Sequence, residues 1–220
     1  MICNVIATGS QGNAVALDDK ILIDCGVPYK QIAHLVRGLK LVLLTHRHQD
    51  HFNPTTIKRL HRERPTLRFG CCDWMVPYLL DAGVSPLAID IYRISNWTPI
   101  YKYLNGNIIV KPFPLFHDVE NCGYMINFGQ ERVLYATDTS TLDHVTAKAF
   151  DLYLIEANHT EDEIADRIQR KQVAGEYVYE HRVERTHLSR ESADAWLAMN
   201  AGRNSEIIYL HQHKEPTKKE

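Results

Sequence analysis

Residues 45–51, THRHQDH, bring four side chains that can bind a metal ion into one short stretch. These side chains are His46, His48, Asp50 and His51. Imidazole and carboxylate ligands together suit a borderline cation such as zinc. A polar surface loop would explain two histidines alone, but it does not require four candidate ligands within six residues. The types and spacing of these residues therefore predict a metal site.

The cluster follows a predicted buried strand, which would place it at the edge of a sheet. Residues 39–45, LKLVLLT, are mostly apolar and rich in branched side chains, as in a strand that is covered on both faces. In the extended segment that leaves this strand, His46 and His48 point the same way, and the turn into the next helix brings the other two ligands back toward them. Asn53 is the expected cap of that helix and Pro54 its first residue. Open sheets place binding sites at such carboxyl ends of strands.

Runs of strands with interspersed helices surround the cluster. The pattern predicts an antiparallel meander near the N-terminus, hairpin turns at residues 105–106 and 129–130, and two facing sheets with helices outside, in the α/β class. We expect a single domain over residues 1–214 and a disordered tail over residues 215–220. The expected strands are residues 2–7, 13–17, 20–24, 39–45, 67–71, 89–94, 98–115, 123–129, 131–138, 150–157 and 206–213, and the expected helices are residues 29–37, 54–64, 74–83, 161–172 and 189–200.

Composition narrows the class of protein. The 220 residues are 45% hydrophobic and 24% charged, which is ordinary for a globular protein, and no apolar run is long enough to span a membrane. The N-terminal residues lack the pattern of a secretion signal, so we expect a cytoplasmic protein without a membrane partner. The net charge of −2 gives no overall attraction to nucleic acid, although residues 58–64 and 181–190 are locally basic. An odd set of cysteines without CxxC spacing indicates reduced thiols: Cys3, Cys25, Cys71, Cys72 and Cys122.

The pattern HxHxDH in the cluster resembles the signature of the metallo-β-lactamase superfamily. The similarity extends to GSQGN at residues 9–13 and LIDCG at residues 22–26, which resemble the opening hairpins of that family. His117, Asp138 and His211 stand in the order, and at the predicted strand ends, where the family places its remaining ligands. The resemblance covers nearly the whole chain and implies a four-layer αββα sandwich.

The resemblance also implies a set of ligands for two metal ions, which we expect to be Zn²⁺, with Mn²⁺ or Fe as alternatives. One ion would bind His46, His48 and His117, the second would bind Asp50, His51 and His211, and Asp138 would bridge them. The two ions would lower the pKa of a shared water or hydroxide toward neutrality. Asp24 would orient one imidazole by a hydrogen bond, or else only close a turn. The last ligand is either His211 or His213, because residues two apart on the predicted strand point to the same face of the sheet. The position directly after IIYL favours His211.

Segments near the end of the chain resemble one branch of the superfamily. IEANH at residues 155–159 and THLSRESADAWL at residues 186–197, together with the HDVENCGY stretch, are similar to the YycJ-type branch and, more distantly, to RNase Z. That branch is associated with phosphodiester hydrolysis in nucleic acid. The resemblance therefore implies a nuclease, with DNA or RNA as its partner.

His187 is the proton donor that this branch implies. It would contact the scissile phosphate and protonate the leaving oxygen, with support from Glu156, because an alkoxide leaves poorly without a proton. Together with the metal ligand Asp50, these two residues form the predicted catalytic set. The alternative is that His187 only begins a helix whose true cap is Ser189.

Three functional classes remain open. The leading one is a dinuclear zinc phosphodiesterase, for which Arg182, Arg185 and Arg190 supply local positive charge. The alternative is a hydrolase of small esters, thioesters or lactones that uses the same site. A redox or non-catalytic metal protein is disfavoured, because diiron proteins of this fold carry glutamate where His48 stands and no expected ligand is missing.

Overall fold

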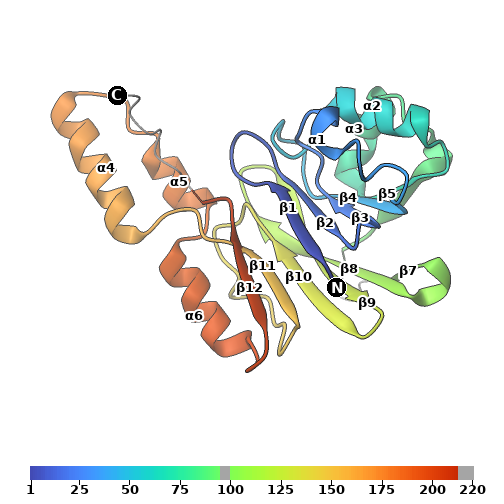
Figure 1. Ribbon diagram of the computed structural model, residues 1–220. Coiled ribbons are helices and arrows are strands. Elements are labelled where there is room, and N and C mark those ends of the chain that lie inside the picture. The colour runs from blue at the N-terminus through green and yellow to red at the C-terminus, as the bar shows by residue number, and fades with distance from the viewer. Residues whose placement is uncertain (95–99, 213–220) are drawn as a thin grey trace.

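Two sheets of six strands each face each other in residues 1–94 and 100–212, the part of the chain that the computed structural model describes. Helices cover the outer faces of both sheets (Figure 1). The strands at the centre of each sheet are buried on both faces, so they require a layer on either side. The four-layer αββα sandwich predicted from the sequence is thereby confirmed.

The first sheet has the strand order β1-β2-β3-β4-β5-β6. Its first three strands form the expected antiparallel meander, and the remaining strands run parallel to β3 with helices on the connections. The elements of this half are β1 (Cys3–Ala7), β2 (Ala14–Leu17), β3 (Ile21–Ile23), α1 (Tyr29–Ile32), β4 (Leu41–Leu44), α2 (Pro54–Glu63), β5 (Arg68–Cys72), η1 (Asp73–Met75), α3 (Val76–Asp81), η2 (Pro86–Ala88) and β6 (Ile89–Tyr92). As predicted, Asn53 caps α2 by accepting a hydrogen bond from the Thr56 amide.

The second sheet has the strand order β12-β11-β10-β9-β8-β7. Strands β7 to β10 are antiparallel neighbours, whereas β10, β11 and β12 run parallel. The elements of this half are β7 (Tyr101–Tyr103), η3 (Leu104–Gly106), β8 (Ile108–Phe116), β9 (Glu120–Phe128), β10 (Glu131–Ala136), β11 (Leu152–Glu156), α4 (Glu161–Ala174), α5 (Glu180–Thr186), α6 (Arg190–Asn200) and β12 (Glu206–Leu210). Helix α6 packs on the outer face, whereas α4 and α5 extend away from both sheets (Figure 1). No helix among the described residues is long and apolar enough to cross a membrane.

Three clusters of buried apolar side chains hold the layers together. One lies between the first sheet and helices α1 to α3, and another joins the second sheet to α6. The cluster between the sheets contains Tyr92, Tyr124 and Tyr135, whose rings span the gap that smaller side chains would leave. This packing fixes the carboxyl ends of β4 and of β10 to β12 relative to each other.

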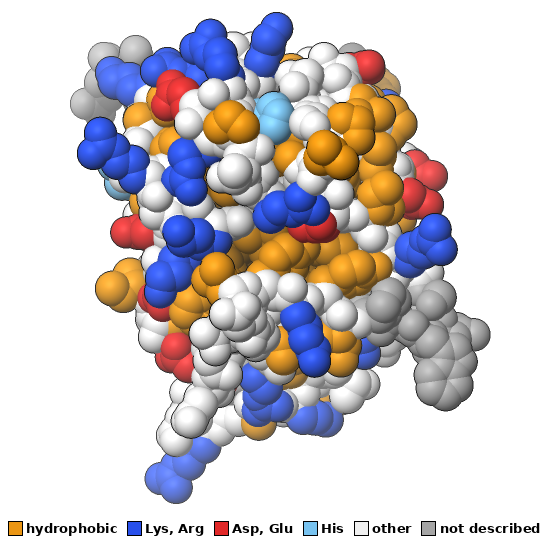
Figure 2. Space-filling view, turned by 90° about the vertical axis from the view of Figure 1, so that its right-hand side faces the viewer, with side chains coloured by type: hydrophobic (Ala, Val, Ile, Leu, Met, Phe, Trp, Pro, Cys, Tyr) orange, Lys and Arg blue, Asp and Glu red, His pale blue; other side chains and the backbone are white. Residues whose placement is uncertain are grey.

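Tyrosine side chains connect β6 and β7, which are edge strands of the two sheets. The Tyr92 hydroxyl lies 2.5 Å from the Tyr103 hydroxyl, and the ring of Tyr92 packs 4.1 Å from that of Tyr101. Figure 2 shows hydrophobic side chains gathered on the side of the molecule where β7 lies. Leu87, which precedes β6, and Ile100, which precedes β7, are exposed. Among the described residues, β6 and β7 are therefore not paired as strands and are joined through the side chains of Tyr92, Tyr101 and Tyr103.

Several predicted elements differ from the observed ones. The helix expected at residues 29–37 ends at Ile32 and continues as turns, and the one expected at residues 74–83 is split into η1 and α3. The hairpins at residues 105–106 and 129–130 are confirmed. Helix α5 was not predicted, because its sequence EHRVERT offers almost no apolar stripe. The predicted tail and His213 lie outside the described residues, so the proposed domain limit stays a prediction.

The final strand is shorter than predicted. It ends at Leu210, because His211 adopts a left-handed backbone with φ of 52° and its amide donates to the Thr8 hydroxyl at 2.7 Å. The prediction of a strand over residues 206–213 is therefore wrong at His211 and Gln212, and His213 lies outside the described residues. Because His211 lies beyond the end of the strand, alternation along a strand does not determine where its side chain points.

Candidate metal centre

All nine predicted site residues meet at the carboxyl ends of strands from both sheets. They are His46, His48, Asp50 and His51 after β4, His117 after β8, Asp138 after β10, Glu156 at the end of β11, His187 before α6 and His211 after β12. Residues far apart in the sequence converge here because the two sheets face each other with these strand ends at the same edge. The structure thus brings together all nine of these residues, whereas the alternative last ligand, His213, lies outside the described residues.

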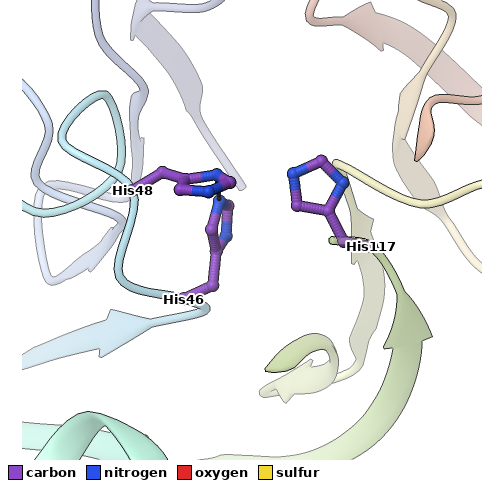
Figure 3. Close-up of side chains that lie close together, drawn as sticks. All are labelled: His46, His48 and His117. Carbon is purple, nitrogen blue, oxygen red and sulfur yellow. Dashed lines mark hydrogen bonds between the residues drawn. The ribbon is translucent and has the colours of Figure 1, made fainter. Parts of the chain in front are cut away.

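Three histidines from the two sheets form one group of candidate ligands. The Nε2 atom of His46 lies 3.2 Å from Nδ1 of His48, and their ring centroids are 4.8 Å apart. His117 faces this pair from the other side, with its ring 5.4 Å from that of His46 and 5.1 Å from that of His48 (Figure 3). One nitrogen of each residue lies within 4.8 Å of the others, a spacing that fits ligands of a shared ion.

Asp138 lies between this group and a second group, which is formed by Asp50, His51 and His211. Its Oδ2 atom is 2.6 Å from His51 Nε2 and 3.8 Å from His46 Nε2. Its Oδ1 atom is 3.5 Å from His211 Nε2. Asp138 has a φ of 56°, a conformation that is uncommon outside glycine and that aims its carboxylate between the groups. The geometry thus suits the bridging position.

One nitrogen of each of four histidines is occupied by a partner from the chain. The partners of Nδ1 are the Thr45 hydroxyl for His46 at 3.0 Å, Asp24 for His51 at 2.8 Å and the Thr186 carbonyl for His117 at 3.0 Å. The Nδ1 of His211 lies 3.0 Å from the amide nitrogen of Asn158 and 3.3 Å from Glu156. An Nδ1–H that donates outward leaves the Nε2 lone pair directed at the shared space. The chain therefore sets the tautomers that a cation requires at His46, His51 and His117.

Asp24 organises the buried side of the centre. Its Oδ1 atom accepts from the amide and hydroxyl of Thr45 at 3.0 and 2.9 Å, and its Oδ2 atom accepts from His51 and from the Tyr135 hydroxyl, the latter at 3.0 Å. The hydrogen bond to an imidazole that the sequence suggested for Asp24 is confirmed. Thr45 and Tyr135 were missed, because only the folded chain brings Tyr135 of β10 beside Asp24.

The charges at the centre fit a bound cation. Burial would raise the pKa of Asp138, but His51 and His211 hold it well below its usual range. Burial would lower the pKa of His51, but Asp138 and Asp24 raise it to about 10. In the described chain, Nε2 of His211 and Oδ2 of Asp138 are buried without a hydrogen bond of acceptable geometry, although His51 approaches the latter closely. Carboxylates and imidazoles that are buried together in this way require positive charge among them, which a divalent cation supplies.

Glu156 and His187 form a pair beside the second group. The Nδ1–H of His187 donates to Glu156 Oε1 at 2.6 Å, and the amide of Thr139 donates to Glu156 Oε2 at 2.9 Å. The ring of His187 stacks on that of His211 at 5.1 Å and 9°, and its Nδ1 lies 3.3 Å from Asp138 Oδ1. Burial would lower the pKa of His187, but Glu156 and Asp138 raise it to about 9.

Two further polar residues at the centre were not predicted as site residues from the sequence. Asn13 of the GSQGN segment contacts two residues of the cluster. Its amide nitrogen lies 2.7 Å from His51 Nε2 and donates to the carbonyl of Asp50 at 3.2 Å. Asp118 lies over the first group, with Oδ1 at 3.1 Å from His117 Nε2 and 3.4 Å from His48 Nε2. In the sequence, only its position next to His117 suggested a role for Asp118. That position does not tell whether the Asp118 side chain points toward the ligands.

The glycine of LIDCG has a steric role. A Cβ atom on Gly26 would lie 1.7 Å from the carbonyl oxygen of Asp50, so no other residue lets these two backbones approach. The backbone amide of Cys25 also donates to the carbonyl of His51 at 2.9 Å. The two segments that resembled the family, GSQGN and LIDCG, thus support the cluster from the backbone side.

The sequence and the fold both match known proteins. Residues 19–211 match the family model described as "Beta-lactamase superfamily domain". A search of curated proteins found no match.

Solved structures share the fold at low sequence identity. The metallo-beta-lactamase fold protein YhfI from Bacillus subtilis superposes with a TM-score of 0.69 at 18% identity, covering 96% of this chain and 85% of its own. Human tRNase Z, short form, gives 0.71 at 15% identity, covering 97% and 93%. Zn²⁺-bound PqqB from Methylobacterium extorquens gives 0.63 at 15% identity, covering 96% and 89%. With the family model spanning most of the sequence, the chain belongs to the metallo-β-lactamase superfamily.

Proposed function

We propose that this protein is a metal-dependent hydrolase, and specifically a dinuclear zinc phosphodiesterase that acts on nucleic acid. The observation that carries the proposal is the position of Asp138, which lies between two groups of ligands and also contacts the pair formed by His187 and Glu156. A site of this kind combines places for two cations with a proton donor beside them. Phosphodiester hydrolysis needs both.

The histidines and carboxylates would hold two divalent cations, one at each group. His46, His48 and His117 would bind the first ion; Asp50, His51 and His211 would bind the second; and Asp138 would touch both. Bound cations of this type activate a water nucleophile and stabilise the charge that grows on the attacked phosphate. Zinc suits the ligand types, and the similarly folded PqqB was solved with Zn²⁺ bound.

His187 would serve as the proton donor for the leaving oxygen. Its Nδ1 is committed to Glu156, so Nε2 is the nitrogen that can reach the substrate. Two backbone amides, those of Thr139 and Leu188, fix the carboxylate of Glu156, and this fixes the direction of the imidazole. His187 also lines a cavity of about 350 Å³, which offers space for a departing group.

Nucleic acid as the substrate is supported by a relative and, only weakly, by local charge. The similarly folded tRNase Z is named for action on tRNA. The basic residues near the site contribute unequally: Arg182 is paired with Asp118 and Arg190 with Asp194, whereas Arg185 forms no ion pair within the described residues. Electrostatic attraction is therefore weak, which favours short substrates over a long bound duplex.

The proposal is tested by metal analysis together with a panel of labelled substrates. We expect the purified protein to hold close to two transition-metal ions per chain and to cleave single- or double-stranded DNA or RNA. His46→Ala should lower the metal content and abolish cleavage, because it removes a ligand of the first ion. His34→Ala is the matched control, since His34 is exposed in the turn after α1.

Two results would contradict the proposal. Full activity after exhaustive chelation would exclude the metal centre from the reaction. Turnover of esters, thioesters or lactones without any cleavage of nucleic acid would instead establish the alternative of a small-molecule hydrolase.

A further inference from the structure

A cavity of about 600 Å³ opens beside Asp50 and is not used by the residues assigned so far. It lies between the GSQGN segment, the loop after β4 and the end of α3. This volume is typical of sites that bury a small organic ligand. The residues that define its chemistry are Gln11, Arg47, Gln49, Phe52, Tyr78 and Asp81.

The cavity lies on the side of the metal centre that faces away from His187. Asp50 lines it and places Oδ2 at 3.6 Å from His211 Nε2. His187 stacks on His211 and contacts Asp138, so these two residues separate Asp50 from the proton donor. A phosphate held at the metals would therefore direct one substituent toward His187 and the other toward this cavity.

The walls of the cavity combine aromatic surface with amide groups. The rings of Phe52 and Tyr78 meet edge to face, with centroids 6.4 Å apart at 65°, and Tyr78 is only half-buried. The side chains of Gln11 and Gln49 are exposed on its rim. A flat heterocycle can stack on such a ring while amides hydrogen-bond to its edge.

Charge distinguishes this cavity from the smaller one beside His187. Arg47 is exposed on the rim of the larger cavity and forms no ion pair within the described residues, so it can meet a phosphate or a base edge. The cavity beside His187 is lined by Glu161 and Glu184, by hydroxyl groups and by the imidazoles of His159 and His187, without a Phe, Tyr or Trp ring. Both cavities contain carboxylates, which repel a polyanion, but only the larger one also has an arginine to offset them. The smaller cavity is therefore the poorer place for a nucleotide that stays bound.

We propose that the cavity beside Asp50 is a nucleobase subsite, which holds the base of the nucleotide on the side of the scissile phosphate opposite the leaving group. The inference rests on the proposed phosphodiesterase function and names its substrate class as nucleotides bound through one base. Tyr78 provides the stacking face, and Gln49 and Gln11 contact the edge of the base. Recognition of this kind tolerates different bases, because every base has a flat face.

The test compares two substrates that share a leaving group. Thymidine 5′-(p-nitrophenyl phosphate) carries a base on the retained side, whereas methyl p-nitrophenyl phosphate does not. We expect the metal-loaded protein to prefer the thymidine ester in kcat/KM, and Tyr78→Ala to reduce this preference about 5- to 150-fold, the range for loss of one stacked base. Tyr78→Phe should keep the preference because it keeps the ring. Tyr177→Ala is the control, since Tyr177 is 86% exposed beyond α4.

A preference that survives in Tyr78→Ala would overturn the subsite. Tyr78→Leu retains apolar packing against Phe52 but has no flat face, so it should behave like Tyr78→Ala. A loss of preference in Tyr78→Leu would therefore not be explained by misfolding. Calorimetric titration with thymidine 5′-monophosphate and with inorganic phosphate separates the two proposals. If the protein hydrolyses neither ester, the phosphodiesterase function fails, while tighter binding of the nucleotide that is lost in Tyr78→Ala would still support the subsite. Equal affinity for the nucleotide and for phosphate would exclude it.

Discussion

At the scale of single residues, the centre depends on groups that hold the ligands as much as on the ligands. Asp24 accepts four hydrogen bonds and is fully buried, and its contact with His51 sets which nitrogen of that imidazole faces the site. The ligand types were predictable from HxHxDH because side chains on a short segment share a direction. Their supports were not, because Asn13, Tyr135 and Asp118 reach the centre from separate strands and loops.

Asp138 is the residue whose loss should affect both metal positions at once. Asp138→Ala removes a carboxylate that faces His51 with one oxygen and His211 with the other. We expect the affinity for both ions to fall by at least about 100-fold, more than is typical for loss of a residue that only supports a ligand. Zinc titration by calorimetry measures both sites, with Asp143→Ala as an exposed control. Loss of one ion with normal affinity for the other would contradict a bridging role.

His187 is the residue that separates proton donation from simple binding of phosphate. His187→Ala should keep both metals and lose about 10²- to 10⁴-fold in turnover on a dinucleotide, whose alkoxide leaves poorly without a proton. The loss should be far smaller on a nitrophenyl ester, because nitrophenolate departs unprotonated. Equal losses on both substrates, with the metal content intact, would mean that His187 binds phosphate or shapes the pocket. Little loss on either would leave it as the residue that begins α6.

At the scale of elements, the strands that carry ligands were predicted better than the segments that end them. Buried strands such as β4 and β11 have continuous apolar sequences, which identify them without any knowledge of their neighbours. The end of β12 was wrong because His211 leaves the strand to meet Thr8, a contact between residues at opposite ends of the chain. Helix α5 was missed because it buries little apolar surface and is fixed through polar contacts.

Those polar contacts tie α5 to the centre. Its last residue, Thr186, accepts from His117, and Arg182 pairs with Asp118 over the first group of ligands. The Arg182 side chain is 67% exposed, so the ion pair contributes only modestly to the stability of the helix. Helix α5 thus positions a candidate ligand through weak interactions.

The contribution of this ion pair is measurable by amide hydrogen exchange. Arg182→Ala should speed exchange in α5 by about 1.4- to 5-fold, as expected for an exposed pair worth about 0.2 to 1 kcal/mol, and should leave α6 unchanged. Arg185→Ala is the control on the same helix, because Arg185 forms no ion pair within the described residues. Unchanged exchange in α5 of the Arg182 variant would show that the pair with Asp118 does not hold the helix.

At the scale of the whole molecule, the centre lies on the seam between the two sheets. The first sheet supplies the ligands after β4, and the second supplies His117, Asp138 and His211. Ions bound there would cross-link two layers that are otherwise joined by the apolar cluster between the sheets and by the contacts of Asp24. Metal binding is therefore coupled to the stability of the entire fold, since the ligands meet only in the folded chain.

Removal of metal should lower the thermal stability of the whole protein. Free ions at 1,000 times their dissociation constant stabilise a folded protein by about 4 kcal/mol per site. For a chain of this size, 1 kcal/mol shifts the Tm by about 2–4 °C, so chelation should lower the Tm by about 8–16 °C per site. Scanning calorimetry with and without chelator measures this, and added Zn²⁺ should restore the original value. On chelation, the Tm of His46→Ala should fall by less than that of the unmodified protein, and the Tm of His34→Ala should fall by the same amount. An identical Tm before and after complete removal of metal would show that the ions do not join the sheets.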